Sequence, residues 1–288
     1  MNLILKGMRP KTLVAAIVPP MCAYAYYYAE FGLQNISYFF LCVLLALFIQ
    51  IATNFYNDAI DHLKGADEYR VGPERITTQD KVDSKKVFRI GHFFIFLAFC
   101  MGVPLVLKGG VIILFLGLLS LALAYGYTGG PFPLAYLGLG EIFVFIFFGL
   151  VATLGSFYLF SQTLSLPVIV LATQLGFLSS VLIAINNYRD KEQDVLVNKR
   201  TLATRMSNSR YLSLIDFMLF TPYFLILYFM LFIDLKYFIL LFSISLAYKI
   251  RKELHEIVEM EKLNNILALS GKHLLFFSLL FSLASICR

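Results

Sequence analysis

The chain has 288 residues, of which 59% are hydrophobic and only 15% are charged. A soluble domain keeps about a quarter of its residues charged, and a chain this apolar would expose far too much hydrocarbon to water. The composition therefore excludes an ordinary soluble protein and predicts an integral protein of the lipid bilayer. Its four cysteines stand in apolar runs without metal-like spacing, which argues against disulfide or zinc roles.

Nine apolar stretches are candidates for membrane-spanning helices, since one crossing needs about 20 mainly apolar residues. In chain order they are residues 12–29, 36–56, 87–107, 110–127, 138–160, 166–187, 211–232, 235–248 and 274–287. The last two are short. We therefore expect an all-α membrane protein with nine transmembrane helices in a single domain, residues 1–288.

Basic residues gather in alternate segments between these spans. The N-terminal segment and the segments after the second, sixth and eighth spans hold most of the 24 Lys and Arg residues. Cytoplasmic loops of membrane proteins carry such an excess. This predicts a plasma-membrane protein whose N-terminus and two long loops are cytoplasmic. The net charge of +6 then reflects topology, and we expect no nucleic-acid partner.

Two acidic motifs stand where an apolar span meets the predicted cytoplasmic surface. The first reads NFYNDAID (residues 54–61) and the second reads NNYRDKEQD (residues 186–194). Residues three or four apart share a helix face, so we expect one face to carry Asn57, Asp61 and Lys64. The matching face of the second motif carries Asn187, Asp190 and Asp194. The four spans between the motifs return both to one side of the membrane, which suggests a weak repeat of two loose halves, about 1–130 and 131–288.

The residue types in these motifs favour a magnesium–diphosphate site. Carboxylate and amide oxygens suit hard cations such as Mg²⁺, with Mn²⁺ as a substitute, and Mg²⁺ is usually shared between carboxylates and substrate phosphates. Nearby basic residues can neutralise the remaining phosphate charge; they are Lys64, Arg70, Arg75, Arg189 and Lys199. An allylic diphosphate held in this way would ionise toward a carbocation, which aromatic side chains stabilise.

At these two motifs the chain resembles the UbiA superfamily of intramembrane prenyltransferases, over nearly its whole length. The resemblance implies a ring of nine helices around a central cavity that opens laterally to lipid, with polyprenyl diphosphate as a substrate. Taken with the motif faces, it implies catalytic roles for Asp61, Asp190 and Asp194. The metal ligands would be Asn57, Asp61, Asn187, Asp190 and Asp194. The diphosphate-binding residues would be Asn57, Lys64, Asp67, Arg70, Arg189 and Lys199.

Shorter phrases are similar to one branch of that superfamily. They are RPKT (9–12), KGAD (64–67), RVGP (70–73), YTGGPFP (127–133), GLGE (138–141) and KRTLA (199–203). That branch prenylates the aromatic acid 1,4-dihydroxy-2-naphthoate, with loss of CO₂, to give demethylmenaquinone in menaquinone biosynthesis. The acceptor would then contact Tyr127 and Glu141, although Glu141 can instead join helices by hydrogen bonds. The sequence also allows a related enzyme that uses another aromatic acceptor, such as homogentisate.

A membrane transporter with an acidic ion site is the alternative from a different class. Transporter sites tend to lie at the bilayer midplane on broken helices. Here the acidic residues follow the spans and stand beside long basic loops. That placement favours an enzyme that acts on a cytoplasmic diphosphate.

Overall fold

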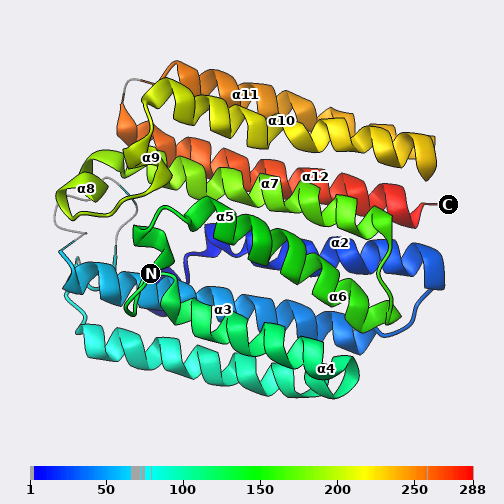
Figure 1. Cartoon of the computed structure of the whole chain (residues 1–288), viewed down its shortest axis with the longest axis horizontal. Helices are drawn as coiled ribbons and strands as arrows, with labels where there is room; N and C mark the ends of the chain where they lie inside the picture. Colours follow the sequence, from blue (N-terminus) through cyan, green and yellow to red (C-terminus); the bar gives the residue numbers. More distant parts are fainter. Residues whose placement is uncertain (1–2, 66–71, 73–74, 79, 258, 288) are drawn as a thin grey trace.

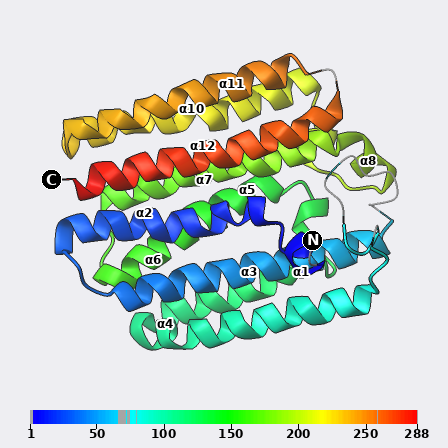
Figure 2. The same ribbon diagram turned by 180° about the vertical axis from the view of Figure 1, so that it is seen from behind.

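The computed structural model describes residues 3–65, 72, 75–78, 80–257 and 259–287, and these residues are helical or irregular, without a β-strand. The elements are α1 (Leu3–Met8), η1 (Pro10–Thr12), α2 (Val14–Phe31), α3 (Ile36–Leu63), α4 (Ser84–Gly126), η2 (Leu134–Tyr136), α5 (Gly140–Val144), η3 (Phe145–Val151), α6 (Ala152–Ser161), α7 (Leu166–Arg189), α8 (Lys191–Leu196), α9 (Leu202–Arg205), α10 (Asn208–Phe232), η4 (Leu235–Ser243), α11 (Ile244–His255), η5 (Met260–Lys262) and α12 (Leu263–Ile286). The long helices run side by side along the long axis of the molecule (Figures 1 and 2).

Six helical stretches within the described residues are long and apolar enough to cross a membrane. They cover residues 36–63, 84–126, 140–161, 166–189, 208–232 and 260–286. The predicted spans at 235–248 and 274–287 are extended in the structure, to η4–α11 and to α12. The sequence-based bounds were too short because polar residues such as Lys249 and Lys272 lower the local hydropathy without interrupting the helix.

α4 contains two of the predicted spans. A continuous helix of 43 residues would be about 65 Å long, roughly twice the thickness of the hydrocarbon core. The backbone at Gly110 is not helical (φ 69°, ψ −157°), a conformation that glycine adopts at little cost. The chain turns back there, and the second arm of α4 returns toward α3 (Figure 1).

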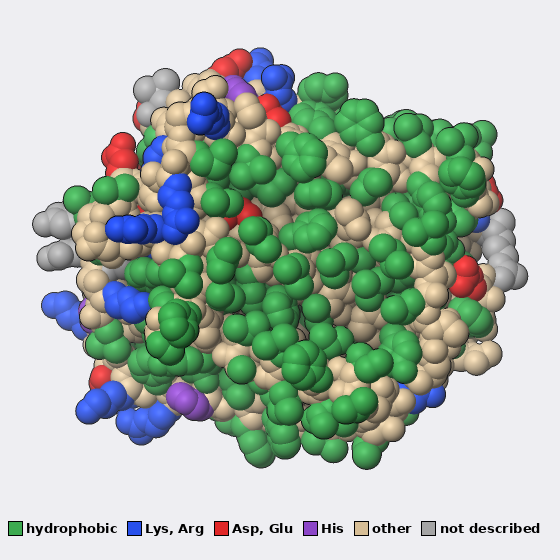
Figure 3. All heavy atoms as spheres, viewed as in Figure 1, with side chains coloured by type: hydrophobic (Ala, Val, Ile, Leu, Met, Phe, Trp, Pro, Cys, Tyr) green, Lys and Arg blue, Asp and Glu red, His purple; other side chains and the backbone are tan. Residues whose placement is uncertain are grey.

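The surface is that of a protein whose middle faces hydrocarbon. Large apolar side chains are widely exposed, among them Leu107 at 83% and Val111 at 76%. In Figure 3 hydrophobic side chains cover the middle of the molecule, and basic side chains gather at the end where α8 and α9 lie. Water would penalise so large an apolar surface, whereas lipid does not.

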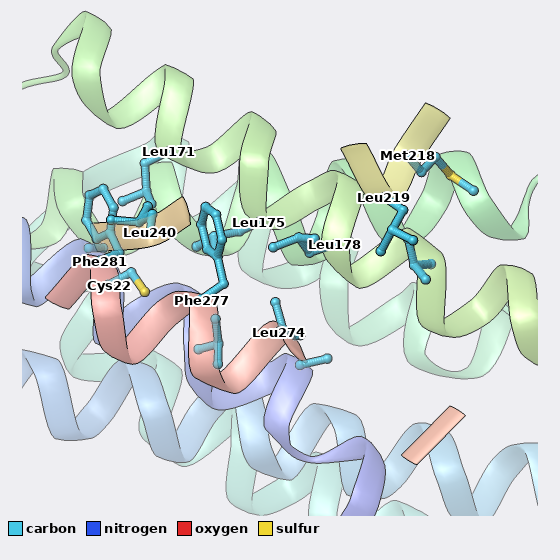
Figure 4. Close-up of a cluster of buried hydrophobic side chains, with 14 of the residues drawn as sticks. Cys22, Leu171, Leu175, Leu178, Met218, Leu219, Leu240, Leu274, Phe277 and Phe281 are labelled. Atoms are coloured by element: carbon cyan, nitrogen blue, oxygen red, sulfur yellow. The ribbon is translucent and has the colours of Figure 1, made fainter. Parts of the chain in front are cut away.

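The packed interior centres on α7. Its buried leucines meet side chains of α2, α10, η4 and α12, as Figure 4 shows for Leu171, Leu175 and Leu178. On another face of α7 small residues recur every fourth position, at Ala172, Gly176 and Ser180. Small residues let helix backbones approach closely. A Cβ added to Gly149 of η3 would lie only 2.4 Å from the Cα of Gly176, so this contact requires glycine.

The ends of α3 and α7 lie at the same end of the molecule, next to α8 and α9 (Figure 1). The predicted return of both acidic motifs to one face is therefore confirmed. The buried side chain of Asn54 on α3 donates to the Met8 carbonyl at 2.9 Å. That bond fastens the N-terminal segment to the same end.

Candidate functional site

A polar pocket of about 60 Å³ lies between the ends of α3 and α7. Eight residues predicted for the site line it: Asn57, Asp61, Arg75, Tyr127, Asn187, Asp190, Asp194 and Lys199. Other lining residues are Arg9, Thr128, Ala135, Ile183, Asn186 and Gln193. The two motifs, separated by more than a hundred residues in the chain, thus form one site.

Asp61 is held from two directions. Its Oδ2 accepts from the Arg75 guanidinium at 2.7 Å, and its Oδ1 accepts from the Tyr136 hydroxyl at 3.0 Å. The neighbouring Asp58 accepts from the backbone N–H groups of Ile76 and Thr77 at 3.2 and 3.3 Å. Asp58 therefore anchors the turn that carries Arg75, which explains why the motif contains two buried carboxylates.

Asp190 lies at the end of α7 and pairs with its neighbour Arg189. The Arg189 Nε and Nη2 atoms both donate to the Asp190 carboxylate at 2.7 Å. Arg189 also donates to Asn186 at 2.7 Å and to Asn264 of α12 at 2.9 Å. Its guanidinium does not line the pocket, so in this arrangement Arg189 joins α7 to α12 and orients Asp190.

Asp194 and Lys199 form the third pair of the pocket, with Nζ and Oδ1 3.0 Å apart. Burial raises the pKa of the Asp194 carboxyl to about 6, because the nearby lysine only partly offsets it. Burial alone would lower the pKa of Lys199, but Asp194, Asp61 and Asp190 together raise it. The Asp194 Oδ2 atom is buried without a hydrogen-bond partner among the described residues, so this oxygen is available to a ligand.

Lys64 and Asn57 are both connected to Thr128. The Thr128 hydroxyl donates to Asn57 Oδ1, and the Lys64 ammonium donates to the Thr128 carbonyl at 2.9 Å. Lys64 also lies 3.8 Å above the centroid of the Tyr136 ring. Burial lowers the pKa of Lys64. Its ammonium stands beside the pocket but does not line it.

Of the two residues predicted to contact the aromatic acceptor, Tyr127 and Glu141, only one lines the pocket. Tyr127 lines the pocket. Glu141 is 4% exposed and lies behind Asn187, whose Nδ2 donates to Glu141 Oε1 at 2.9 Å. Glu141 therefore reaches the pocket only through Asn187. Asp67 and Arg70, the remaining predicted residues, lie outside the described part of the chain.

Sequence reasoning assigned no site role to Tyr136 or Arg9. Tyr136 is bonded to Asp61, with the ammonium groups of Lys64 and Lys199 at 3.8 and 5.7 Å from its ring centroid. It belongs to no motif, and nothing in its sequence surroundings marks it. Arg9 lines the pocket. Its sequence did offer a signal for a site role, because Arg9 is the first residue of the family-like phrase RPKT.

A second, apolar cavity of about 160 Å³ lies among the membrane-spanning helices. It is lined by residues of α2, α3, α4, α5, η3 and α6, including Leu45, Ile49, Thr53, Gly117, Phe143 and Phe147. Thr53 precedes Asn57 by one helical turn on α3, so the two spaces share a helix face. The Phe143 ring lies 5.2 Å from the Tyr127 ring and stacks on Phe147 at 4.5 Å. Aromatic rings thus lie between the lining of one space and the lining of the other.

The donor set of the pocket fits Mg²⁺ shared with a phosphate ligand. Within the described residues no three His, Cys, Asp or Glu side chains stand close enough to form a metal site by themselves. Amide and carboxylate oxygens from both motifs nevertheless face one small space, and in this part of the chain Asp194 Oδ2 has no competing hydrogen bond. Mg²⁺ commonly uses few protein carboxylates and completes its shell with phosphate and water.

Comparison with known proteins gives a consistent result. The model of the UbiA prenyltransferase family matches residues 17–284. A 1,4-dihydroxy-2-naphthoate octaprenyltransferase of Haemophilus influenzae is 36% identical over 211 residues, covering 69% of this chain and 67% of that protein. The enzyme of the same name in Escherichia coli is 34% identical, covering 70% and 68%.

Solved structures show the same fold at low sequence identity. A UbiA homolog from Archaeoglobus fulgidus bound to GPP and Mg²⁺ superposes with a TM-score of 0.69 at 13% identity, over the full length of both chains. A UbiA homolog from Aeropyrum pernix gives a TM-score of 0.67 at 13% identity, over 91% of this chain and 97% of that one.

Proposed function

Because the chain belongs to the UbiA prenyltransferase family, and is thus a membrane-embedded prenyltransferase, we propose that it transfers a polyprenyl group from polyprenyl diphosphate to 1,4-dihydroxy-2-naphthoate. The observation that carries this proposal is that a lining residue of the polar pocket, Tyr127, packs against a lining residue of the apolar cavity, Phe143, with ring centroids 5.2 Å apart. Such a pair of spaces suits a ligand with a diphosphate head and a hydrocarbon tail. The names of the relatives favour the naphthoate acceptor.

The proposed architecture has nine membrane spans around the apolar cavity, with a lateral opening through which the prenyl tail enters from lipid. In addition to the six stretches named above, α2 and η4–α11 supply one span each, and Gly110 divides α4 into two. We propose one domain with two loose halves. The basic end of the molecule (Figure 3) faces the cytoplasm of a plasma-membrane protein, in keeping with the charge rule.

In the proposed site, five oxygen-bearing residues hold Mg²⁺, or Mn²⁺, with the diphosphate. They are Asn57, Asp61, Asn187, Asp190 and Asp194. Bound Mg²⁺ would neutralise the diphosphate and make it a better leaving group. Lys199 and Arg75 line the same pocket and add positive charge close to the phosphate oxygens. Lys64 approaches from beside the pocket and Arg189 acts through Asp190. Asp67 and Arg70, which follow α3 in the sequence, would complete the diphosphate-binding set.

The reaction balances without an external acid or base. The C–O bond between the prenyl carbon and the diphosphate breaks, and the electron pair leaves with the diphosphate. The allylic cation is then attacked by the naphthoate ring carbon that carries the carboxylate. The new C–C bond forms there, and the old bond to the carboxylate breaks with release of CO₂, so its electrons restore the ring. In the proposed complex the cation would lie near the Phe143 and Tyr127 rings, and aromatic faces stabilise cations.

Tyr127 is the proposed contact for the aromatic acid, since it lines the pocket and lies against Phe143. Homogentisate is the runner-up acceptor. Its carboxylate is on a side-chain carbon, so the cation would bond to a ring carbon that carries hydrogen, and loss of that proton would restore the ring. Family membership removes the transporter alternative.

The test is a product assay with purified protein, Mg²⁺, farnesyl diphosphate and a panel of aromatic acids. We expect a farnesylated product of dihydroxynaphthoate whose mass shows the loss of CO₂. Transfer to homogentisate alone would refute the naphthoate assignment but keep the prenyltransferase. A product that retains the carboxylate would refute the decarboxylation step.

A further inference from the structure

A buried group of hydrogen bonds lies directly behind the pocket, where α5, α7 and α10 meet. Glu141 Oε1 accepts from Asn187 Nδ2 at 2.9 Å and also from the Tyr211 hydroxyl. The three residues are 4%, 5% and 0% exposed. Building on the function proposed above, we infer that Glu141 is a positioning residue: it turns the Asn187 amide so that its oxygen faces the Mg²⁺–diphosphate ligand.

The chemistry of the two groups fixes the orientation of the amide. A carboxylate only accepts hydrogen bonds, whereas an amide has one donating and one accepting end. Asn187 must therefore turn its NH₂ group toward Glu141. Its Oδ1 atom is then left for the pocket that Asn187 lines. Without this partner the amide could rotate and present its NH₂ group to a metal, which that group cannot bind.

Glu141 is itself rigidly held. The Ser180 hydroxyl of α7 lies 3.1 Å from the Glu141 carbonyl, within the stripe of small residues that brings α5 and η3 close to α7. The Tyr211 ring stacks on Tyr188 at 6.0 Å. Glu141 Oε2 is buried without a hydrogen bond to any described residue, so Oε1 alone serves both donors, and loss of the carboxylate releases both.

A reversal of the hydrogen bond provides the sharpest test. Asn187→Asp would place two carboxylates face to face and weaken ligand binding. Adding Glu141→Gln reverses the bond: the new amide at position 141 donates to the new carboxylate at position 187, whose second oxygen faces the pocket. The Tyr211 hydroxyl can then accept from the same amide and donate to the Ala184 carbonyl, which is 3.2 Å away. Glu141→Leu removes the bond altogether.

The readout is the dissociation constant of geranyl diphosphate, measured by calorimetry in detergent with Mg²⁺ and without an aromatic acid. Partners that orient metal ligands contribute about 10- to 100-fold to affinity, so we expect Glu141→Leu to weaken binding at least tenfold. Asn187→Asp should weaken binding similarly, and the double variant should return within about threefold of the wild type. Recovery in the double variant also shows that loss in the single variant is not misfolding.

The control is Tyr223→Phe, which removes a buried hydroxyl of the same helix, α10, that bonds to Ser243 and His273 away from the pocket; it should leave binding unchanged. Unaltered binding by Glu141→Leu would overturn the inference, as would a double variant no better than Asn187→Asp. A raised KM for the aromatic acid with unaltered diphosphate binding would also overturn it, because Glu141 would then serve the acceptor.

These outcomes separate the inference from the proposed function. If the wild type binds geranyl diphosphate with Mg²⁺ but does not prenylate dihydroxynaphthoate, the acceptor assignment fails, and the binding series still decides the role of Glu141. If the wild type shows no Mg²⁺-dependent binding, both are refuted.

Discussion

Replacing Asp61 with asparagine tests the central assignment, because the substitution removes the charge and almost none of the shape. Asp61 accepts from Arg75 and from Tyr136. In the Asp61→Asn variant the remaining side-chain oxygen can serve Arg75, and the Tyr136 hydroxyl can rotate to accept from the new NH₂ group. The ion pair with Arg75 becomes a hydrogen bond between a cation and a neutral amide, which costs about 1–2 kcal/mol of folding stability. The variant should therefore fold.

The expected effect on catalysis is larger. Removing one preorganised electrostatic group costs about 3–4 kcal/mol of transition-state stabilisation, which corresponds to about 10²–10³-fold in rate. The measurement is the single-turnover rate with geranyl diphosphate and saturating Mg²⁺, together with thermal unfolding in detergent. Asp216→Asn is the matched control, since Asp216 also pairs with an arginine, Arg251, at 3.2 Å, but does not line the pocket. Turnover of the Asp61→Asn variant within threefold of the wild type would refute the assignment.

Other features of the structure support three further tests. Excess chelator should abolish prenyl transfer and added Mg²⁺ should restore it; full turnover in chelator would exclude a metal role. Gly149→Ala should lower the stability by about 1–3 kcal/mol through overpacking against Gly176, measured by thermal unfolding, whereas Gly102→Ala, with its nearest neighbour 4.0 Å away, should have little effect. Gly117→Leu should narrow the apolar cavity, because a Cβ there meets nothing within 4 Å. In competition, that variant should shift product masses from farnesyl toward geranyl; an unchanged ratio would contradict the role of the cavity.

The helices could be predicted from the sequence because lipid leaves a strong compositional signal. Apolar runs of about 20 residues located the spans, and the break between the predicted spans 87–107 and 110–127 fell at the turn within α4. The short helices α8 and α9 were not predicted, since a single helical turn has no periodicity to detect. The convergence of the two motifs followed from counting the spans between them.

The partners of each site residue could not be predicted in the same way. Helical spacing grouped Lys64 with Asn57 and Asp61, but Lys64 lies just beyond the end of α3, and its ammonium bonds to Thr128 instead. Arg189 follows Asn187 in the motif, yet its guanidinium reaches α12. Both outcomes depend on the position of elements distant in the chain, and local spacing carries no such information.

The ion pairs of the pocket bear on which ligand can enter it. Each acid of the site has its own base: Asp61 has Arg75, Asp190 has Arg189 and Asp194 has Lys199. A lone metal ion would compete with these bases, and a lone diphosphate would compete with the acids. A metal and a diphosphate that arrive together offer new partners to both sets at once. Because of this internal pairing, the pocket would bind a metal cation alone or free phosphate alone only weakly. It would bind the metal and the diphosphate together much more strongly.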